Sequence, residues 1–216
     1  MIRKLLYFLG LAVMLNSCVT VGILTSSVNS NEIKDIQYFE PISYVNYIEK
    51  RDLMFYNDSL SAIGYYKVDS VLAARSSKYR LSEKFIAKND KEQERLDFEI
   101  LSVVESIAKN RSLSGAVLPP TVKKVIRRTN NRFGMAVIHV GYLRSSGNYA
   151  GKLLKASLGI QDNYLFWGRT KVYIVIFDTL NENLAFYGES FGLEETHPTN
   201  SYSISKKINK IFRVYY

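Results

Sequence analysis

Residues 188–192 (GESFG) have the G-x-S-x-G spacing that presents a nucleophilic serine in many hydrolases. In those enzymes the serine lies on a sharp turn between a strand and a helix, and an acid and a histidine follow it along the chain. Here residues 194–198 read EETHP, which has no apolar helical pattern, and 26 residues remain after Ser190. The sequence therefore predicts a strand end at Ser190 and a chain that is not an enzyme, with a serine hydrolase as the second alternative function.

Two other groups have part of a ligand-binding pattern. Residues 147–152 resemble a phosphate-binding loop, but three residues separate the glycines where four are needed, and Leu153 stands where Ser or Thr would bind Mg²⁺. His197 and the two glutamates before it could hold a divalent ion only loosely, so a solvated loop is expected there. His139 lies in an apolar run typical of a buried strand. We expect no cofactor, no metal and no catalytic residue.

Composition narrows the class of protein further. The chain has 216 residues, 47% of them hydrophobic and 23% charged, which suits one domain with a substantial core. A mean hydropathy of −0.09 argues against a protein with several membrane spans. The single cysteine excludes a disulfide scaffold and a zinc site made of cysteines.

The amino-terminal residues have the pattern of a secretory signal. Arg3 and Lys4 precede an apolar run at residues 5–15, and the only cysteine, Cys18, follows two small polar residues. Eleven apolar residues are too few to cross a bilayer, which takes about 20. The alternative is an uncleaved anchor that extends over residues 5–24.

The segment Leu15-Asn16-Ser17-Cys18 resembles the lipobox of bacterial lipoproteins. This resemblance implies that Cys18 is diacylated on its sulfur, that the chain is cleaved before it, and that the new amine is then acylated. Two or three acyl chains hold a protein on a membrane, whereas one chain binds weakly. Val19 stands where an aspartate would retain such a protein in the inner membrane, so the resemblance favours the periplasmic face of the outer membrane.

The pattern divides the chain into a signal peptide (1–17), a lipidated tether (18–31) and one globular periplasmic domain (32–216). The tether rests on the polar residues 25–31 (TSSVNSN). Strands are expected at 36–48, 133–143, 171–177 and 184–191, with an ambiguous segment at 79–87. Helices are expected at 60–74, 90–109, 122–131 and 202–216.

Two of these strands, 133–143 and 171–177, are nearly continuous apolar runs, which indicates burial on both faces. We therefore predict an α/β (α+β) fold, a single domain with a mixed β-sheet of four or five strands and helices on both faces. The element order over residues 36–216 is similar to the periplasmic domains of the curli-secretion lipoproteins, the lipoprotein activators of penicillin-binding proteins and the Tol-Pal amino-terminal domain. This resemblance assigns no functional residue.

Basic residues gather on two of the expected helices. Without residues 1–17, which contain Arg3 and Lys4, 27 of the 29 basic residues remain against 20 acidic ones, a net charge of +7. The first basic set, on one helix face, is Lys123, Lys124, Arg127 and Arg128. The second set, on the last helix, is Lys206, Lys207, Lys210 and Arg213. Behind a lipoprotein signal such a face would meet another envelope protein, peptidoglycan or anionic lipid and no nucleic acid; the alternative is two solvated faces.

Residues 144–169 form a long insertion between two central strands and contain the only tryptophan, Trp167. The insertion is either a contact segment that lies on a partner or bilayer, or a flap over the core.

The leading prediction for the whole chain is an outer-membrane-anchored lipoprotein that acts as a non-enzymatic binding or envelope-assembly module. The alternative is an oligomeric secretion-channel component, which needs a membrane-crossing hairpin, and only residues 145–169 leave room for one.

Overall fold

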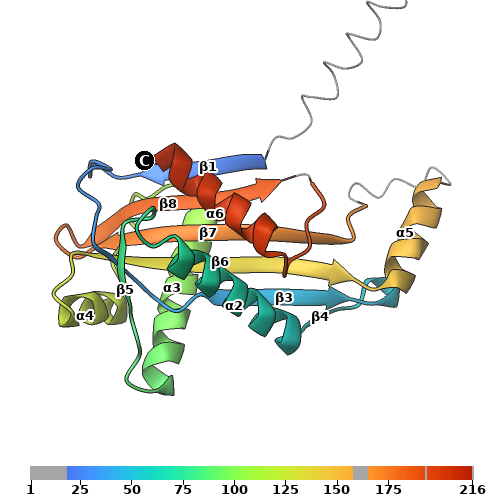
Figure 1. Ribbon diagram of the computed structural model, residues 1–216, viewed down its shortest axis with the longest axis horizontal. Helices are drawn as coiled ribbons and strands as arrows, with labels where there is room; N and C mark the ends of the chain where they lie inside the picture. Colours follow the sequence, from blue (N-terminus) through green and yellow to red (C-terminus); the bar gives the residue numbers. More distant parts are fainter. Residues whose placement is uncertain (1–18, 158–164, 193, 216) are drawn as a thin grey trace, which may run out of the picture.

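The computed structural model describes residues 19–157, 165–192 and 194–215. The predicted signal peptide and Cys18 lie outside these residues. The strands are β1 (Val19–Thr25), β2 (Ile36–Tyr38), β3 (Ile42–Ile48), β4 (Met54–Tyr56), β5 (Leu81–Lys84), β6 (Phe133–Arg144), β7 (Gly168–Asp178) and β8 (Asn183–Gly192). The helices are α2 (Asp58–Ala74), α3 (Asp90–Asn110), α4 (Pro120–Arg128), α5 (Ser146–Ser157), α6 (Ser201–Tyr215) and a short 3₁₀ turn, η1 (Lys50–Asp52). Figure 1 shows their arrangement.

All eight described strands belong to one mixed sheet; six follow the order β1-β8-β7-β6-β2-β5, and β3 pairs with both β6 and β4 beside this path. The pairs β1–β8, β8–β7 and β7–β6 are antiparallel, whereas β2 and β3 both pair with β6 in parallel. The chain leaves β2 and re-enters the sheet as β3 after Pro41, so the single strand expected at 36–48 is two strands. A mixed sheet is confirmed, but four or five strands is an undercount because β1 and β4 were also not expected.

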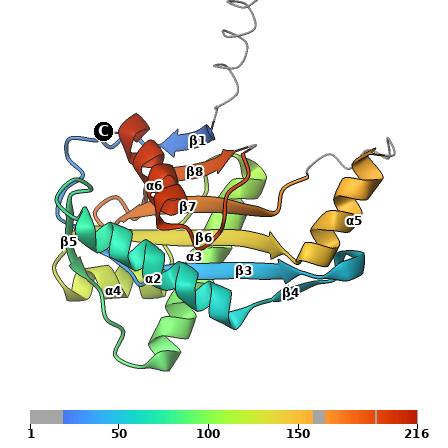
Figure 2. The ribbon, with the colours of Figure 1, turned by 45° about the vertical axis from the view of Figure 1, so that its right-hand side comes forward.

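Helices cover both faces of the sheet, as predicted. Alternate side chains of β6 point to opposite faces: Met135 and Val137 pack with α2 and α6, while Ala136 and Ile138 pack with α3 and α4. Figure 2 shows α2 and α6 in front of the sheet and α3 behind it. Because β6 and β7 are buried on both sides, their sequences are nearly continuous apolar runs.

The predicted tether is corrected by β1. Residues 19–25 form an edge strand antiparallel to β8, from Val19 opposite Gly192 to Thr25 opposite Phe186. The half-buried side chains of Val21 and Ile23 pack against the core, which covers the edge that β8 would otherwise expose. The folded domain therefore starts at Val19 rather than at residue 32, and no spacer separates it from Cys18.

The two ends of the sheet are used below as reference points. The proximal end is where β1 begins and β6 ends, at Val19 and Arg144; the distal end is where β1 ends and β6 begins, at Thr25 and Phe133. In Figure 1, α5 lies at the proximal end and α4 at the distal end.

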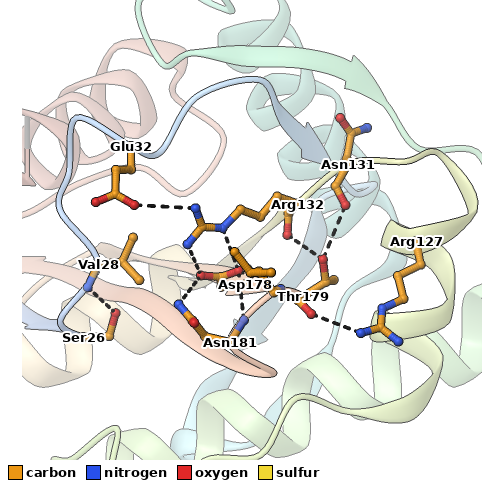
Figure 3. Close-up of polar contacts among 10 residues, drawn as sticks. Ser26, Val28, Glu32, Arg127, Asn131, Arg132, Asp178, Thr179 and Asn181 are labelled. Atoms are coloured by element: carbon orange, nitrogen blue, oxygen red, sulfur yellow. Dashed lines mark hydrogen bonds and ion pairs between the residues drawn. The ribbon is translucent and has the colours of Figure 1, made fainter.

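A buried aspartate organises the distal end (Figure 3). The Asp178 side chain is fully buried and accepts hydrogen bonds from Arg132 Nε (3.0 Å), Leu180 N (2.9 Å) and Asn181 Nδ2 (2.9 Å). Burial by itself would raise the pKa of Asp178, but the hydrogen bonds from Arg132 and from the turn outweigh it and lower the pKa. These bonds fix the β7–β8 turn to the start of β6.

Candidate functional site

The proximal end carries the most unusual surface of the described residues. It comprises α5, the tip of the β3–β4 hairpin with η1, and the residues just before β7. β1 begins at the same end, directly after Cys18. The site therefore lies at the same end of the sheet as the predicted lipid attachment, at the opposite edge.

A buried amide fastens α5 to the hairpin tip. Asn148 is 5% exposed, and its Nδ2 donates to the carbonyl of Glu49 (2.7 Å) and to Asp52 Oδ1 (3.1 Å). Arg144 donates to the Asn148 side-chain oxygen (2.8 Å), which satisfies the other half of the amide. Hydrogen bonds from Lys152 and Asn148 hold the pKa of Asp52 below its ordinary value. These contacts hold α5 in one orientation at the end of the sheet.

The outward side of this unit is apolar. Leu153 and Leu154 of α5 are 53% and 63% exposed, and Leu53 and Met54 beside η1 are 62% and 59% exposed. Ala150 lies one turn before the two leucines on the same side of the helix. Large aliphatic side chains gathered at one end of a domain mark a contact surface more often than chance exposure does.

An aromatic pair and a surplus of positive charge accompany this surface. The rings of Tyr149 and Trp167 meet edge to face, with centroids 5.1 Å apart. Residues 49–52 and 144–155 together contain five basic residues and two acidic ones, which is a net charge of +3. Aliphatic, aromatic and basic groups on one surface suit a bilayer boundary or an acidic protein surface.

The structure settles part of the expectation for residues 144–169. Residues 146–157 form a helix whose only fully buried side chain is Asn148, so this part is not a flap over the core. It is also not the β-hairpin that the channel alternative requires. Residues 158–164 lie outside the described part of the chain.

The basic face predicted on α4 is largely neutralised. Glu182 pairs with both Lys123 and Arg127, and Arg128 donates to both oxygens of Glu92. Lys124, Arg127 and Arg128 are exposed, and Lys124 has no ion pair among the described residues. α4 lies at the distal end, opposite to the end at which β1 begins (Figure 1).

The second basic set is not a single face. Lys207 is 1% exposed and lies on the inner side of α6 with Ile204, Ile208 and Ile211, and burial lowers its pKa. Lys206 instead pairs with Glu194 at 3.4 Å. The grouping of Lys207 with the solvated lysines is therefore wrong, because its spacing from Ile204 and Ile211 places it on the buried stripe.

Ser190 does not lie on a nucleophile turn. It is within β8, opposite Val21 of β1 and Val172 of β7, and it is fully buried. Its hydroxyl oxygen has no hydrogen-bond partner among the described residues. The G-x-S-x-G residues are the last five residues of β8, so the expected strand end is confirmed.

Sequence reasoning missed a buried carboxylate next to Ser190. Glu189 is 1% exposed; it pairs with Lys171 at 2.9 Å and with Arg111, and it accepts a hydrogen bond from the Tyr187 hydroxyl at 3.3 Å. Burial would raise the pKa of Glu189, but Lys171 and Arg111 lower it. The group joins the end of α3 to the sheet, and no local pattern marks it because its partners come from other elements.

The two histidines serve structural contacts. His139 is fully buried, its Nδ1 lies 2.9 Å from the Ser43 hydroxyl, and burial lowers its pKa to about 4. His197 is exposed and contacts Thr199. Glu194 instead pairs with Lys206, and Glu195 accepts a hydrogen bond from the Trp167 backbone N–H.

Among the described residues no group of three or more His, Cys, Asp or Glu side chains could hold a metal ion. No helix in these ranges is long and apolar enough to cross a membrane.

Comparison with known proteins gives no family. No family model and no curated protein matches the chain. A PelC dodecamer from Paraburkholderia phytofirmans is similar over 90% of this chain and 95% of that chain, with 9% identity and a TM-score of 0.38. A DUF4136 family protein from Bacteroides thetaiotaomicron VPI-5482 is similar over 91% of this chain and 95% of that chain, with 10% identity and a TM-score of 0.40. Similarity at this level supports no argument about the function of this chain.

Proposed function

We propose that this chain is a bacterial lipoprotein, held by acylated Cys18 on the periplasmic face of the outer membrane, that acts as a non-enzymatic binding or envelope-assembly module. The sequence support is the short apolar run followed by Leu15-Asn16-Ser17-Cys18. The structural support is the position of β1.

β1 starts at Val19, so the acyl group would be attached one residue, about 3.4 Å, before a paired strand. A lipid attached this close to the sheet restricts how far the domain can swing away from the bilayer. The proximal end then faces the membrane and the distal end faces the periplasm. The start of β1 at Val19, directly after the predicted attachment residue, is the observation that carries the proposal.

This orientation of the domain favours some classes of partner for the α4 basic face over others. α4 lies at the distal end, so its exposed Lys124 points away from the lipids that hold the anchor. Another envelope protein or peptidoglycan suits this face better than lipid of the same membrane.

The proposal that the chain is an oligomeric channel component gains no support, because residues 146–157 form α5 where a spanning hairpin would be needed.

The anchor is tested by Cys18→Ala in the full chain, with Ser17→Ala as the matched control because it keeps a small residue before the cysteine. We expect wild type and Ser17→Ala to incorporate labelled palmitate and to fractionate with the outer membrane. Cys18→Ala should lose the label completely and should stay as an uncleaved precursor. Equal labelling of all three proteins would show that Cys18 is not the site.

The absence of catalysis is tested with a serine-reactive phosphonate. We expect no covalent labelling of wild type or of Ser190→Ala, because the Ser190 hydroxyl is buried between two neighbouring strands. Labelling of wild type that the substitution removes would instead make Ser190 a nucleophile.

A further inference from the structure

We infer that α5 and the β3–β4 hairpin tip form a second membrane contact, which lies on the anionic phospholipid surface beside the lipid anchor. This inference rests on the proposed function, because it takes Cys18 as the point of attachment. The surface in question is defined by the exposed residues Leu53, Met54, Leu153 and Leu154 and is called the apolar tip below.

The register of the sheet shows how far the apolar tip extends. Val21 of β1 lies opposite Ser190, which lies opposite Val172, which lies opposite His139 of β6. From this level toward the proximal end, β1 extends two more residues, to Val19. In the same direction β6 extends five more residues, to Arg144. The end of β6 thus extends about 10 Å beyond the start of β1. α5 begins beyond that point, so it projects past the attachment of the anchor.

The two contacts lie at opposite edges of the sheet. Strands β8, β7 and β6 separate β1 from β3, which places the start of β1 about 19 Å to the side of the hairpin, at four strand spacings. Figures 1 and 2 both show α5 at the end of the sheet where β1 begins. If Cys18 is embedded through its acyl chains and β1 runs away from the bilayer, the apolar tip lies beyond the level of the anchor and reaches the bilayer surface. A plane of lipid therefore meets both edges at once.

The chemistry of the tip suits lipid. Leu153 and Leu154 point outward from α5, while Asn148 and Lys152 face the hairpin and hold the helix there. Lys155 is exposed on the helix beside the leucines, and Lys50 and Arg51 are exposed on η1. Leucines that enter the acyl boundary, with lysines around them at headgroup level, are the pattern of helices that lie in the membrane interface.

A built-in probe is available, because Trp167 is the only tryptophan and contacts Tyr149 of α5. The full lipidated protein is reconstituted into vesicles of phosphatidylethanolamine and phosphatidylglycerol, some of which carry acyl chains brominated near the headgroup. Bromine quenches indole fluorescence only at short range. We expect the emission of Trp167 to fall about twofold in brominated vesicles, as for a side chain at the headgroup boundary.

The test variant is Leu153→Glu with Leu154→Glu. Its matched control is Val117→Glu with Leu180→Glu, two apolar side chains that are 73% and 69% exposed near the distal β7–β8 turn. All the replaced side chains are exposed, so both proteins should fold. The lipid anchor remains in both, so both should stay on vesicles, but only the α5 variant should lose most of the quenching.

Each other outcome overturns the inference in a recognisable way. Palmitate on Cys18 without quenching of wild type overturns the tip contact and leaves the proposed function intact. Equal quenching in wild type and both variants shows that the leucines make no contact. Protection of α5 from hydrogen exchange in detergent, together with self-association, makes the tip an interface between two copies. A chain that carries no palmitate on Cys18 overturns the proposed function, and this inference with it.

Discussion

The guanidinium of Arg132 donates two hydrogen bonds to the carboxylate of Asp178, from Nε at 3.0 Å and from Nη2 at 2.9 Å. The two residues are 46 positions apart, and the Asp178 side chain is fully buried whereas that of Arg132 is 31% exposed. The pair joins the residue just before β6 to the turn between β7 and β8 (Figure 3).

Removing the cation should leave a buried charge without its partner. We expect Arg132→Met to lower the free energy of unfolding by about 3 kcal/mol, the usual cost of breaking a buried ion pair from one side. Urea denaturation at pH 7 measures the change. Glu32→Gln is the control: it removes the second carboxylate that pairs with Arg132, but that side chain is 57% exposed, so the cost should stay below about 1 kcal/mol.

Asp97 on α3 should make stability depend on pH in the opposite direction from a salt-bridged carboxylate. Burial raises the pKa of Asp97 to about 6 and outweighs a hydrogen bond from Gln93 that lowers it, while Glu40 adds a smaller increase. As pH falls from 7, the folded protein therefore binds this proton at a higher pH than the unfolded chain does. The stability that this protonation adds is fully present below the pKa of the unfolded chain and is lost as pH rises through 6. Asp97→Asn should be more stable than wild type at pH 7.5, with an advantage of up to about 3 kcal/mol that shrinks toward pH 4. Thermal unfolding of both proteins across this range is the measurement, and a constant difference would contradict it.

The α4 basic residues should differ in their effect on stability. Arg128 pairs with Glu92 and lies over the ring of Phe85, with its guanidinium carbon 4.9 Å from the centroid. Arg128→Glu should cost about 1 kcal/mol, because it removes both contacts and places two carboxylates together. Lys124→Glu should change the free energy of unfolding by less than about 0.5 kcal/mol, since Lys124 is exposed. Urea titration compares the two, and equal losses would mean that the Glu92 and Phe85 contacts stabilise nothing.

A chain that begins at residue 32 should be markedly less stable than one that begins at Val19. The shortened chain lacks β1, so the whole edge of β8 loses its hydrogen-bonding partner and the contacts of Val21 and Ile23 with the core disappear. We expect a lower melting temperature and a tendency to aggregate. Calorimetry and light scattering on the two chains check this, and identical melting would show that β1 is dispensable.

The elements with a strong local pattern were predictable. α3 was expected at 90–109 and spans Asp90–Asn110, because acidic residues at its start and apolar residues at helical spacing define it. The β7–β8 hairpin was expected from two apolar runs around residues 180–183 and was found with the turn at that place. Helices on both faces follow from the same runs, because a strand that is apolar on both sides needs two covers.

The elements and contacts that were not predicted from the sequence also have a physical explanation. The residues of β1 (VTVGILT) continue the apolar character of the run before Cys18, so nothing in their order separates strand from signal. β4 has three residues, all exposed, and α5 buries only Asn148, so neither has the periodicity that burial imposes. At the proximal end, the sequence left two alternatives open around Trp167, a contact segment or a flap over the core, and the part played by the β3–β4 hairpin depends on tertiary packing. The buried network of Glu189 is invisible for the same reason.

The pairing of β1 with β8 also sets the order in which the domain can be completed. Val19 and Gly192 are 173 positions apart, so the first strand must wait for nearly the entire chain before its partner exists. In a chain exported with its amino end first, residues 19–25 therefore stay extended and unpaired while the remaining strands and α2 to α5 emerge. If Cys18 is processed as proposed, the bond before it is far from folded structure during that interval, whereas the finished edge strand places it one residue from the sheet. Under the proposed function, the late closure of the sheet would give processing enzymes a period of access that the topology itself provides.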